Sequence, residues 1–87
     1  MPLFTFVAEY KGGTYVSQIR ATNVKAAQKV WVRSLEPKSI TGLGETSHQR
    51  LVDRCASTAP IALEGLRNAW FFDVNGFFVN IITTQQN

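Results

Sequence analysis

The sequence predicts an α+β fold in which two β-hairpins form one four-stranded antiparallel sheet with helices on one face. A glycine-containing turn between β-rich runs occurs near each end of the 87-residue chain, and such turns are strong hairpin signals. Between the hairpins lie two segments with helical periodicity, the first longer than the second. We therefore expect the order ββααββ, with one long and one short helix, in a single domain spanning residues 1–87.

The first hairpin is predicted from two β-rich runs, residues 3–10 and 14–21, around Gly12-Gly13. With these glycines as a two-residue loop, Tyr10 pairs with Tyr15. Alternate residues then form one apolar and one mostly polar face on both strands, so the apolar face should point into the core.

A long amphipathic helix is expected next, with Thr22 or Asn23 as its N-cap. The helix should end near Glu36, because Pro37 cannot continue it. Its expected inward side carries Val24, Ala27, Val30, Trp31, Ser34 and Leu35. A short second helix is predicted from a capping box with Thr46 as N-cap and Gln49 three residues later, extending to about Ala56.

The segment 60–65 leaves two alternatives open. Pro60 and Gly65 are placed as at the start and end of a single helical turn. The alternation of Ile61 and Leu63 also fits an extended edge strand, which tolerates the proline. We favour the edge strand.

The last hairpin is defined by Asn75-Gly76, because both residues tolerate the positive φ angles of a type I′ turn. In this register Val74 pairs with Phe77, and the face that carries them is wholly apolar. Together with the other elements, this face gives the expected core: Phe4, Phe6, Ile19, Trp31, Trp70, Phe72, Phe77, Val79 and Ile81.

The second face of this hairpin is half apolar, which is unusual for a small sheet with one side in water. Contiguous exposed apolar surface generally marks an interaction site. We therefore expect the protein to be a small assembly module that binds a second copy or another protein through this outer face. The interface candidates are Phe71, Asp73, Phe78, Asn80 and Ile82. The alternative is that a loop or the chain ends cover these residues.

Composition argues against several other classes of function. The single cysteine, Cys55, excludes an internal disulfide framework, and His48 is the only histidine. Seven helical positions separate them by about 10.5 Å, too far to share a metal ion or to act as a nucleophile–base pair. We expect no metal, no cofactor and no enzymatic activity. The chain also has no apolar run long enough for a membrane span, and a cytoplasmic location is the default expectation.

A weak nucleic-acid-binding domain is the alternative function. The net charge is +3, and the sequence pI is about 9.4. Lys25, Lys29 and Arg33 recur every four residues on the first helix and could follow phosphate groups. If the protein were an enzyme instead, its pocket would be expected near the Gly42-Leu43-Gly44 loop, with Tyr10, Tyr15 or His48 close by.

Overall fold

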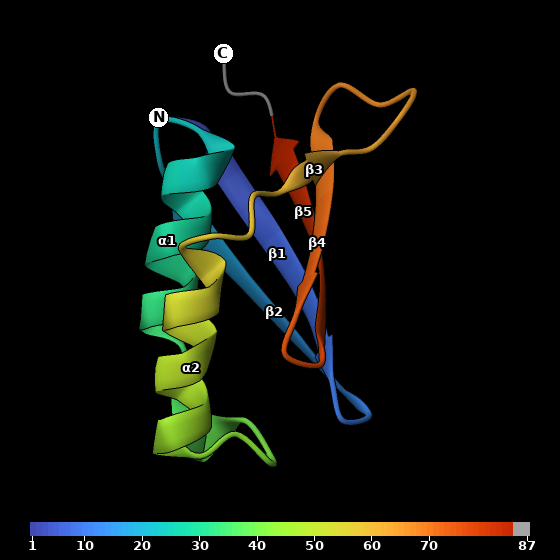
Figure 1. The fold of residues 1–87 in the computed structure, drawn as a ribbon. Helices are drawn as coiled ribbons and strands as arrows, with labels where there is room; N and C mark the ends of the chain where they lie inside the picture. The colour runs from blue at the N-terminus through green and yellow to red at the C-terminus, as the bar shows by residue number, and fades with distance from the viewer. Residues whose placement is uncertain (85–87) are drawn as a thin grey trace.

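The computed structural model describes residues 1–84 as two layers, a five-stranded antiparallel sheet and a pair of α-helices that cover one of its faces (Figure 1). The strand order is β2-β1-β5-β4-β3. The strands are β1 (Leu3–Tyr10), β2 (Gly13–Arg20), β3 (Ile61–Ala62), β4 (Ala69–Val74) and β5 (Phe77–Thr84). The helices are α1 (Val24–Ser34) and α2 (Glu45–Cys55), and the short 3₁₀ helix η1 (Pro37–Ser39) lies between them. The α+β class and the helices on one face are confirmed. The predicted difference between a long and a short helix is wrong, because α1 and α2 have 11 residues each.

The fifth strand is the difference from the predicted four. Ile61 pairs with Phe71 and Ala62 with Trp70, so β3 extends the sheet beside β4. Of the two alternatives for this segment, the edge strand is therefore the correct one. Pro60 stands just before it, a position at which the missing N–H does not weaken the sheet.

The two hairpins meet where β1 of the first hairpin pairs with β5 of the last. These strands pair antiparallel from Leu3 opposite Thr84 to Glu9 opposite Phe78. The first and last strands of the described chain are thereby the central pair of the sheet. The hairpins form one continuous sheet within a single chain.

The register of the first hairpin differs from the predicted one by two residues. Tyr10 pairs with Gly13, so Lys11 and Gly12 form the loop, with φ angles of 47° and 82°. These positive values are typical of a type I′ turn, whose twist matches that of the strands. Because the shift is two residues, every side chain stays on its predicted face.

The register of the last hairpin is confirmed. Val74 pairs with Phe77, and the turn residues Asn75 and Gly76 have φ angles of 48° and 85°. The glycine conformation is one that other residues rarely adopt.

The core lies between the helices and the inner face of the sheet. Of the nine predicted core residues, Trp70 and Ile19 are only half-buried, and the other seven are buried. The inward side of α1 is also rotated from the prediction. Gln28 and Val32 are buried, whereas Ser34 and Val30 are exposed. The reason is that α2 packs beside α1 and covers Gln28 and Val32 in addition to the surface that the sheet covers.

The helix starts differ in how far they follow the prediction. Asn23 is the N-cap of α1, and its side chain accepts a hydrogen bond from the Ala26 N–H at 2.8 Å. In α2 the predicted capping box is wrong, because Gly44 is the N-cap and Thr46 already lies inside the helix. Glu45 in the first turn provides the negative charge that a helix start favours. Neither helix in residues 1–84 is long and apolar enough to cross a membrane.

The turn geometry makes Gly76 sensitive to substitution. We expect Gly76→Ala to lower the free energy of unfolding by about 1–2 kcal/mol, because a side chain at φ 85° is strained. Asn75→Gly is the matched control and should change it by less than about 0.5 kcal/mol, because glycine also adopts the local conformation. Urea unfolding followed by tryptophan fluorescence measures both. Equal effects of the two substitutions would contradict this account of the turn.

Candidate functional site

The outer face of the sheet is the side that the helices leave open. Both helices lie to the left of the sheet in Figure 1, and no helix of the described chain lies to its right. Paired residues project to the same side of a sheet. One cross-strand row on the outer face therefore consists of Val16, Val7, Asn80, Phe71 and Ile61.

The outer apolar patch consists of the apolar residues of this row and the two apolar neighbours of Asn80 on β5: Val7, Val16, Ile61, Phe71, Phe78 and Ile82. Phe78 is 54% exposed and Ile82 is 44% exposed, while Val16 and Ile61 are 63% and 65% exposed. Val7 and Phe71 are half-buried. The patch crosses all five strands, from β2 at one edge to β3 at the other.

The structure brings the five predicted interface residues together on this face. Asn80 lies opposite Phe71, and Asp73 lies opposite Phe78. Ile82 follows Asn80 by two positions on β5. Of the five, only Phe71 is half-buried, and the other four are exposed. The alternative expectation, a loop or chain end covering the patch, does not apply to Phe78 or Ile82 within residues 1–84.

Three members of the patch were not among the predicted candidates: Val7, Val16 and Ile61. Each lies on a strand outside the last hairpin, and the sequence does not give the strand order. The alternation in residues 14–20 does show Val16 on the outer side. Its position in a continuous patch follows only from the pairing of β1 with β5.

Charged residues lie at the two ends of the outer face and not in its middle. Glu9 and Asp73 flank Phe78 in the row nearest the hairpin turns. Arg20 lies beside Leu3 at the opposite end. The two rows between these ends carry only uncharged side chains: Val16, Val7, Asn80, Phe71 and Ile61 in one, and Gln18, Thr5, Ile82 and Ala69 in the other.

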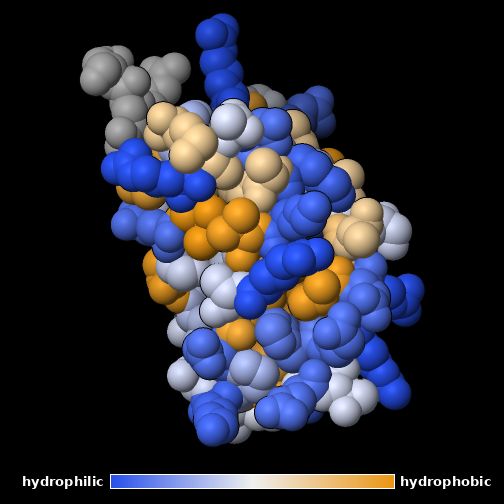
Figure 2. Space-filling model, turned by 90° about the vertical axis from the view of Figure 1, so that its left-hand side faces the viewer, coloured by the Kyte–Doolittle hydropathy of each residue, from blue (hydrophilic) through white to orange (hydrophobic). Residues whose placement is uncertain are grey.

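The helical face has a different character, with a groove of about 480 Å³ between α1 and the C-terminal end of α2. We refer to it as the interhelical groove, and its lining residues are Asn23, Lys25, Ala26, Gln28, Lys29, Val32, Arg33, Val52, Cys55 and Ala56. Figure 2 views the molecule from this side and shows hydrophobic residues exposed among predominantly hydrophilic ones. The sequence alone did not reveal this groove, because it depends on how α1 and α2 pack.

The three predicted nucleic-acid residues lie on one wall of this groove. Lys25, Lys29 and Arg33 are all exposed on α1. The Lys25 Nζ donates to the side-chain oxygen of Gln28 at 3.4 Å and to the Cys55 carbonyl oxygen at 3.5 Å, which links the two helices. Lys29 and Arg33 make no hydrogen bond or ion pair with another described side chain.

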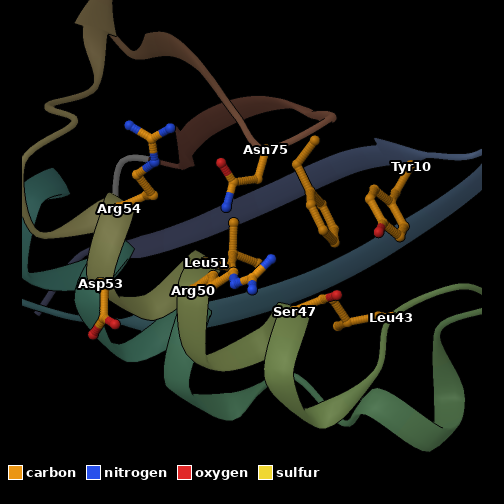
Figure 3. Close-up of a pocket in the computed structure, with 9 residues that line it drawn as sticks. Tyr10, Leu43, Ser47, Arg50, Leu51, Asp53, Arg54 and Asn75 are labelled. Atoms are coloured by element: carbon orange, nitrogen blue, oxygen red, sulfur yellow. The ribbon is translucent and has the colours of Figure 1, made fainter.

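A second cavity of about 470 Å³ lies between α2 and the turn of the last hairpin (Figure 3). Its lining residues are Tyr10, Leu43, Ser47, Arg50, Leu51, Asp53, Arg54, Asn75 and Phe77. Figure 3 shows the Asn75 side chain pointing toward Leu51, whereas that of Asp53 points away from the cavity. The lining contains no histidine or cysteine that could act as base or nucleophile beside Ser47.

The groups predicted for an enzyme pocket are engaged in holding the fold. The Tyr10 hydroxyl donates to the Gly42 carbonyl oxygen at 3.3 Å, and the Tyr15 hydroxyl accepts from the Thr41 N–H at 3.3 Å. The His48 Nε2 lies 2.8 Å from the Val32 carbonyl oxygen, an acceptor, so this nitrogen carries the proton. These contacts fasten the loop before α2 to the sheet and α2 to α1.

The remaining candidate groups are the cysteine and the possible metal ligands. Cys55 is buried at the end of α2, and burial raises the pKa of its thiol from 9.0 to about 11, while the nearby Lys25 charge acts in the opposite direction. Among residues 1–84, no three His, Cys, Asp or Glu side chains are grouped closely enough to hold a metal ion.

Comparison with known proteins adds no family to this description. No protein-family model matches the chain, and neither the curated proteins nor the solved structures include a significant match.

The raised pKa predicts an unreactive thiol. At pH 8, iodoacetamide should alkylate Cys55 in the native protein about 100-fold more slowly than in urea, because two pKa units reduce the thiolate fraction by that factor. The native rate should continue to rise with pH toward 11, whereas the rate in urea should level off near 9. Mass spectrometry of timed samples measures both rates. Equal rates at pH 8 would show that the thiol is accessible and ionised.

Proposed function

We propose that this protein is a non-enzymatic assembly module whose outer sheet face binds a second copy of the same chain. The observation that carries the proposal is the outer apolar patch, which both helices leave open because they lie on the opposite face of the sheet. Phe78 contributes most to the argument, since a phenylalanine that is 54% exposed gains free energy when a partner removes it from water.

The charges at the two ends of the face favour a second copy in one orientation. In a dimer the outer faces of two copies would stack on each other. If the two-fold axis lies between the two sheets and is perpendicular to the strands, the strands of the partner run in the reverse direction. The acidic end with Glu9 and Asp73 then lies toward the partner's basic end with Arg20. A two-fold axis along the strands would instead place acids against acids, which is unfavourable.

The size of the chain also favours association. A domain of 9.7 kDa buries a smaller fraction of its surface than a larger domain, so its own core provides only modest stability. Stacking two sheets about 10 Å apart would produce a four-layer dimer with the sheets inside and the helices outside. The residues of the outer apolar patch would become a second core.

The edge strand β2 offers another route to self-association. It has eight residues, and none of residues 13–19 is charged, whereas β3 at the opposite edge has only two residues. Long uncharged edges invite pairing with another strand. We propose the outer face as the interface because the outer apolar patch extends over five strands. Pairing through the β2 edge is the competing result that the experiment below can detect.

Phe78→Asp should disrupt the dimer. Light scattering after size exclusion should give the native protein a mass of twice 9.7 kDa at high concentration. Loss of about 2 kcal/mol in each of two symmetry-related copies should weaken the dimer by about 10³-fold. The variant should therefore be monomeric at concentrations where the native protein is dimeric.

Val30→Asp is the matched control, because Val30 is 49% exposed but lies on α1, on the opposite layer. It should leave the dimer intact, while circular dichroism checks that both variants are folded. A native protein that is monomeric at every concentration would contradict the proposal. A dimer that Phe78→Asp does not weaken would move the interface to another surface, the β2 edge first.

The nucleic-acid alternative has a narrower basis. The exposure of Lys25, Lys29 and Arg33 is compatible with phosphate contacts. However, the surface beside them is the apolar lining of the interhelical groove, in which no described residue is aromatic and able to stack on a base. We therefore rank this function second.

A further inference from the structure

We infer that the interhelical groove binds an acidic amphipathic helix of a partner protein. This inference is independent of the proposed self-association, which uses the opposite face of the molecule. It assigns the basic residues of α1 to an interaction that includes the apolar surface beside them. The lining, the length and the charge of the groove each suit such a helix.

The lining of the groove is suited to apolar side chains. Val52 of α2 is half-buried, and Val32 and Cys55 are buried beneath the opening. Ala26 and Ala56 have short side chains that leave space for a partner to approach. The polar side chain of Gln28 is already satisfied, because its amide donates to the Thr58 carbonyl oxygen at 2.6 Å and its oxygen accepts from Lys25.

The shape of the groove suits a helix. The helices α1 and α2 run antiparallel side by side, and each has 11 residues, which corresponds to a length of about 16 Å (Figure 1). The groove follows α1 from Asn23 to Arg33, about 15 Å, whereas α2 contributes only residues at its C-terminal end, Val52, Cys55 and the adjoining Ala56. A third helix of two to three turns, about 8–11 residues, would match the α1 wall of the groove. Apolar residues on one side of such a helix, at positions i, i+3, i+4 and i+7, would enter the groove.

The charge of the groove indicates an acidic partner. Its lining residues include three cations and no aspartate or glutamate. Lys29 and Arg33 lack partners among the described side chains, so their charges are available to a bound segment. Because Lys25, Lys29 and Arg33 are spaced one helical turn apart, glutamates repeated every four residues along the partner could contact them in succession.

A duplex or single strand of nucleic acid uses this surface less well. Phosphates would contact the row of cations, but the apolar lining next to it would face a charged backbone and stay unburied. Base stacking needs aromatic side chains, and the described lining provides none. The combination of cations with aliphatic side chains fits acidic and apolar residues on one peptide.

The probe is a fluorescein-labelled synthetic peptide of about 14 residues, long enough for almost four helical turns, built from leucine and glutamate in an amphipathic pattern. Two further peptides serve as controls, one with lysine in place of glutamate and one with the same composition in scrambled order. Fluorescence anisotropy measures binding to the full chain. Labelled single-stranded and duplex DNA of similar length test the competing class of partner.

The decisive variant is the double substitution Lys29→Glu with Arg33→Glu. Lys25 stays unchanged, because its contacts with Gln28 and Cys55 link the helices. Lys38→Glu with Arg50→Glu is the matched control, since it changes the net charge equally at exposed residues that do not line the groove. Phe78→Asp provides a second control, which separates this inference from self-association.

We expect the amphipathic acidic peptide to bind, and both control peptides to bind at least about tenfold more weakly. The groove double variant should weaken binding about tenfold or more, while the charge-matched variant and Phe78→Asp should change it less than about twofold. No binding of the acidic peptide, or equal loss with both double variants, would overturn the inference. Tighter binding of DNA, with a log–log salt slope of about −2.7, would assign the cations to phosphates instead.

Discussion

The contact of Trp31 with three strands is the interaction on which the two-layer arrangement depends. Its ring stacks on Phe6 of β1 at 5.3 Å and meets Phe72 of β4 and Phe77 of β5 edge-on at 5.7 and 6.1 Å. One helical side chain therefore joins both hairpins and fixes the position of α1 on the sheet. Loss of a buried tryptophan generally costs about 3–5 kcal/mol, much of the total stability of a domain this small. The position of α1 in turn decides where α2 packs.

This arrangement separates the two candidate surfaces. Because the helices cover the inner face only, the outer apolar patch stays exposed. Burying it against a partner would therefore be favourable. The interhelical groove lies in the helical layer, on the far side of the core. Its positive charge comes from α1, whereas the charges of the outer face lie at its two ends. The two surfaces therefore differ in both chemistry and position, and the occupant of one need not compete with the occupant of the other.

Local signals in the sequence predicted most elements of the fold, and tertiary contacts determined the remainder. Asn75-Gly76 fixed the last register, because few turns accept these φ angles. The predicted Gly12-Gly13 loop was wrong, because Gly12 can form a two-residue loop with either neighbour, and the structure uses Lys11 and Gly12. Val30 was expected on the inward side and is exposed, whereas Val32 was not expected there and is buried. The reason is that helix periodicity shows one apolar side and does not show the second helix that packs beside it. The interface candidates could be predicted because the last hairpin alone places them on one face. The interhelical groove could not be predicted, because it forms only when the two helices pack together.

The central pairing of β1 with β5 has a consequence for synthesis on the ribosome. Residues 3–9 can form their ladder with β5 only after residues 78–84 exist, although β2 is available to them almost at once. At translation rates of about 5–20 residues per second, the other side of β1 waits several seconds for its partner. During that time Phe4 and Phe6 have neither β5 nor β4 beside them. Such a nascent hairpin has exposed apolar side chains and an unpaired strand edge, and the sequence separation of its final partner favours slow folding.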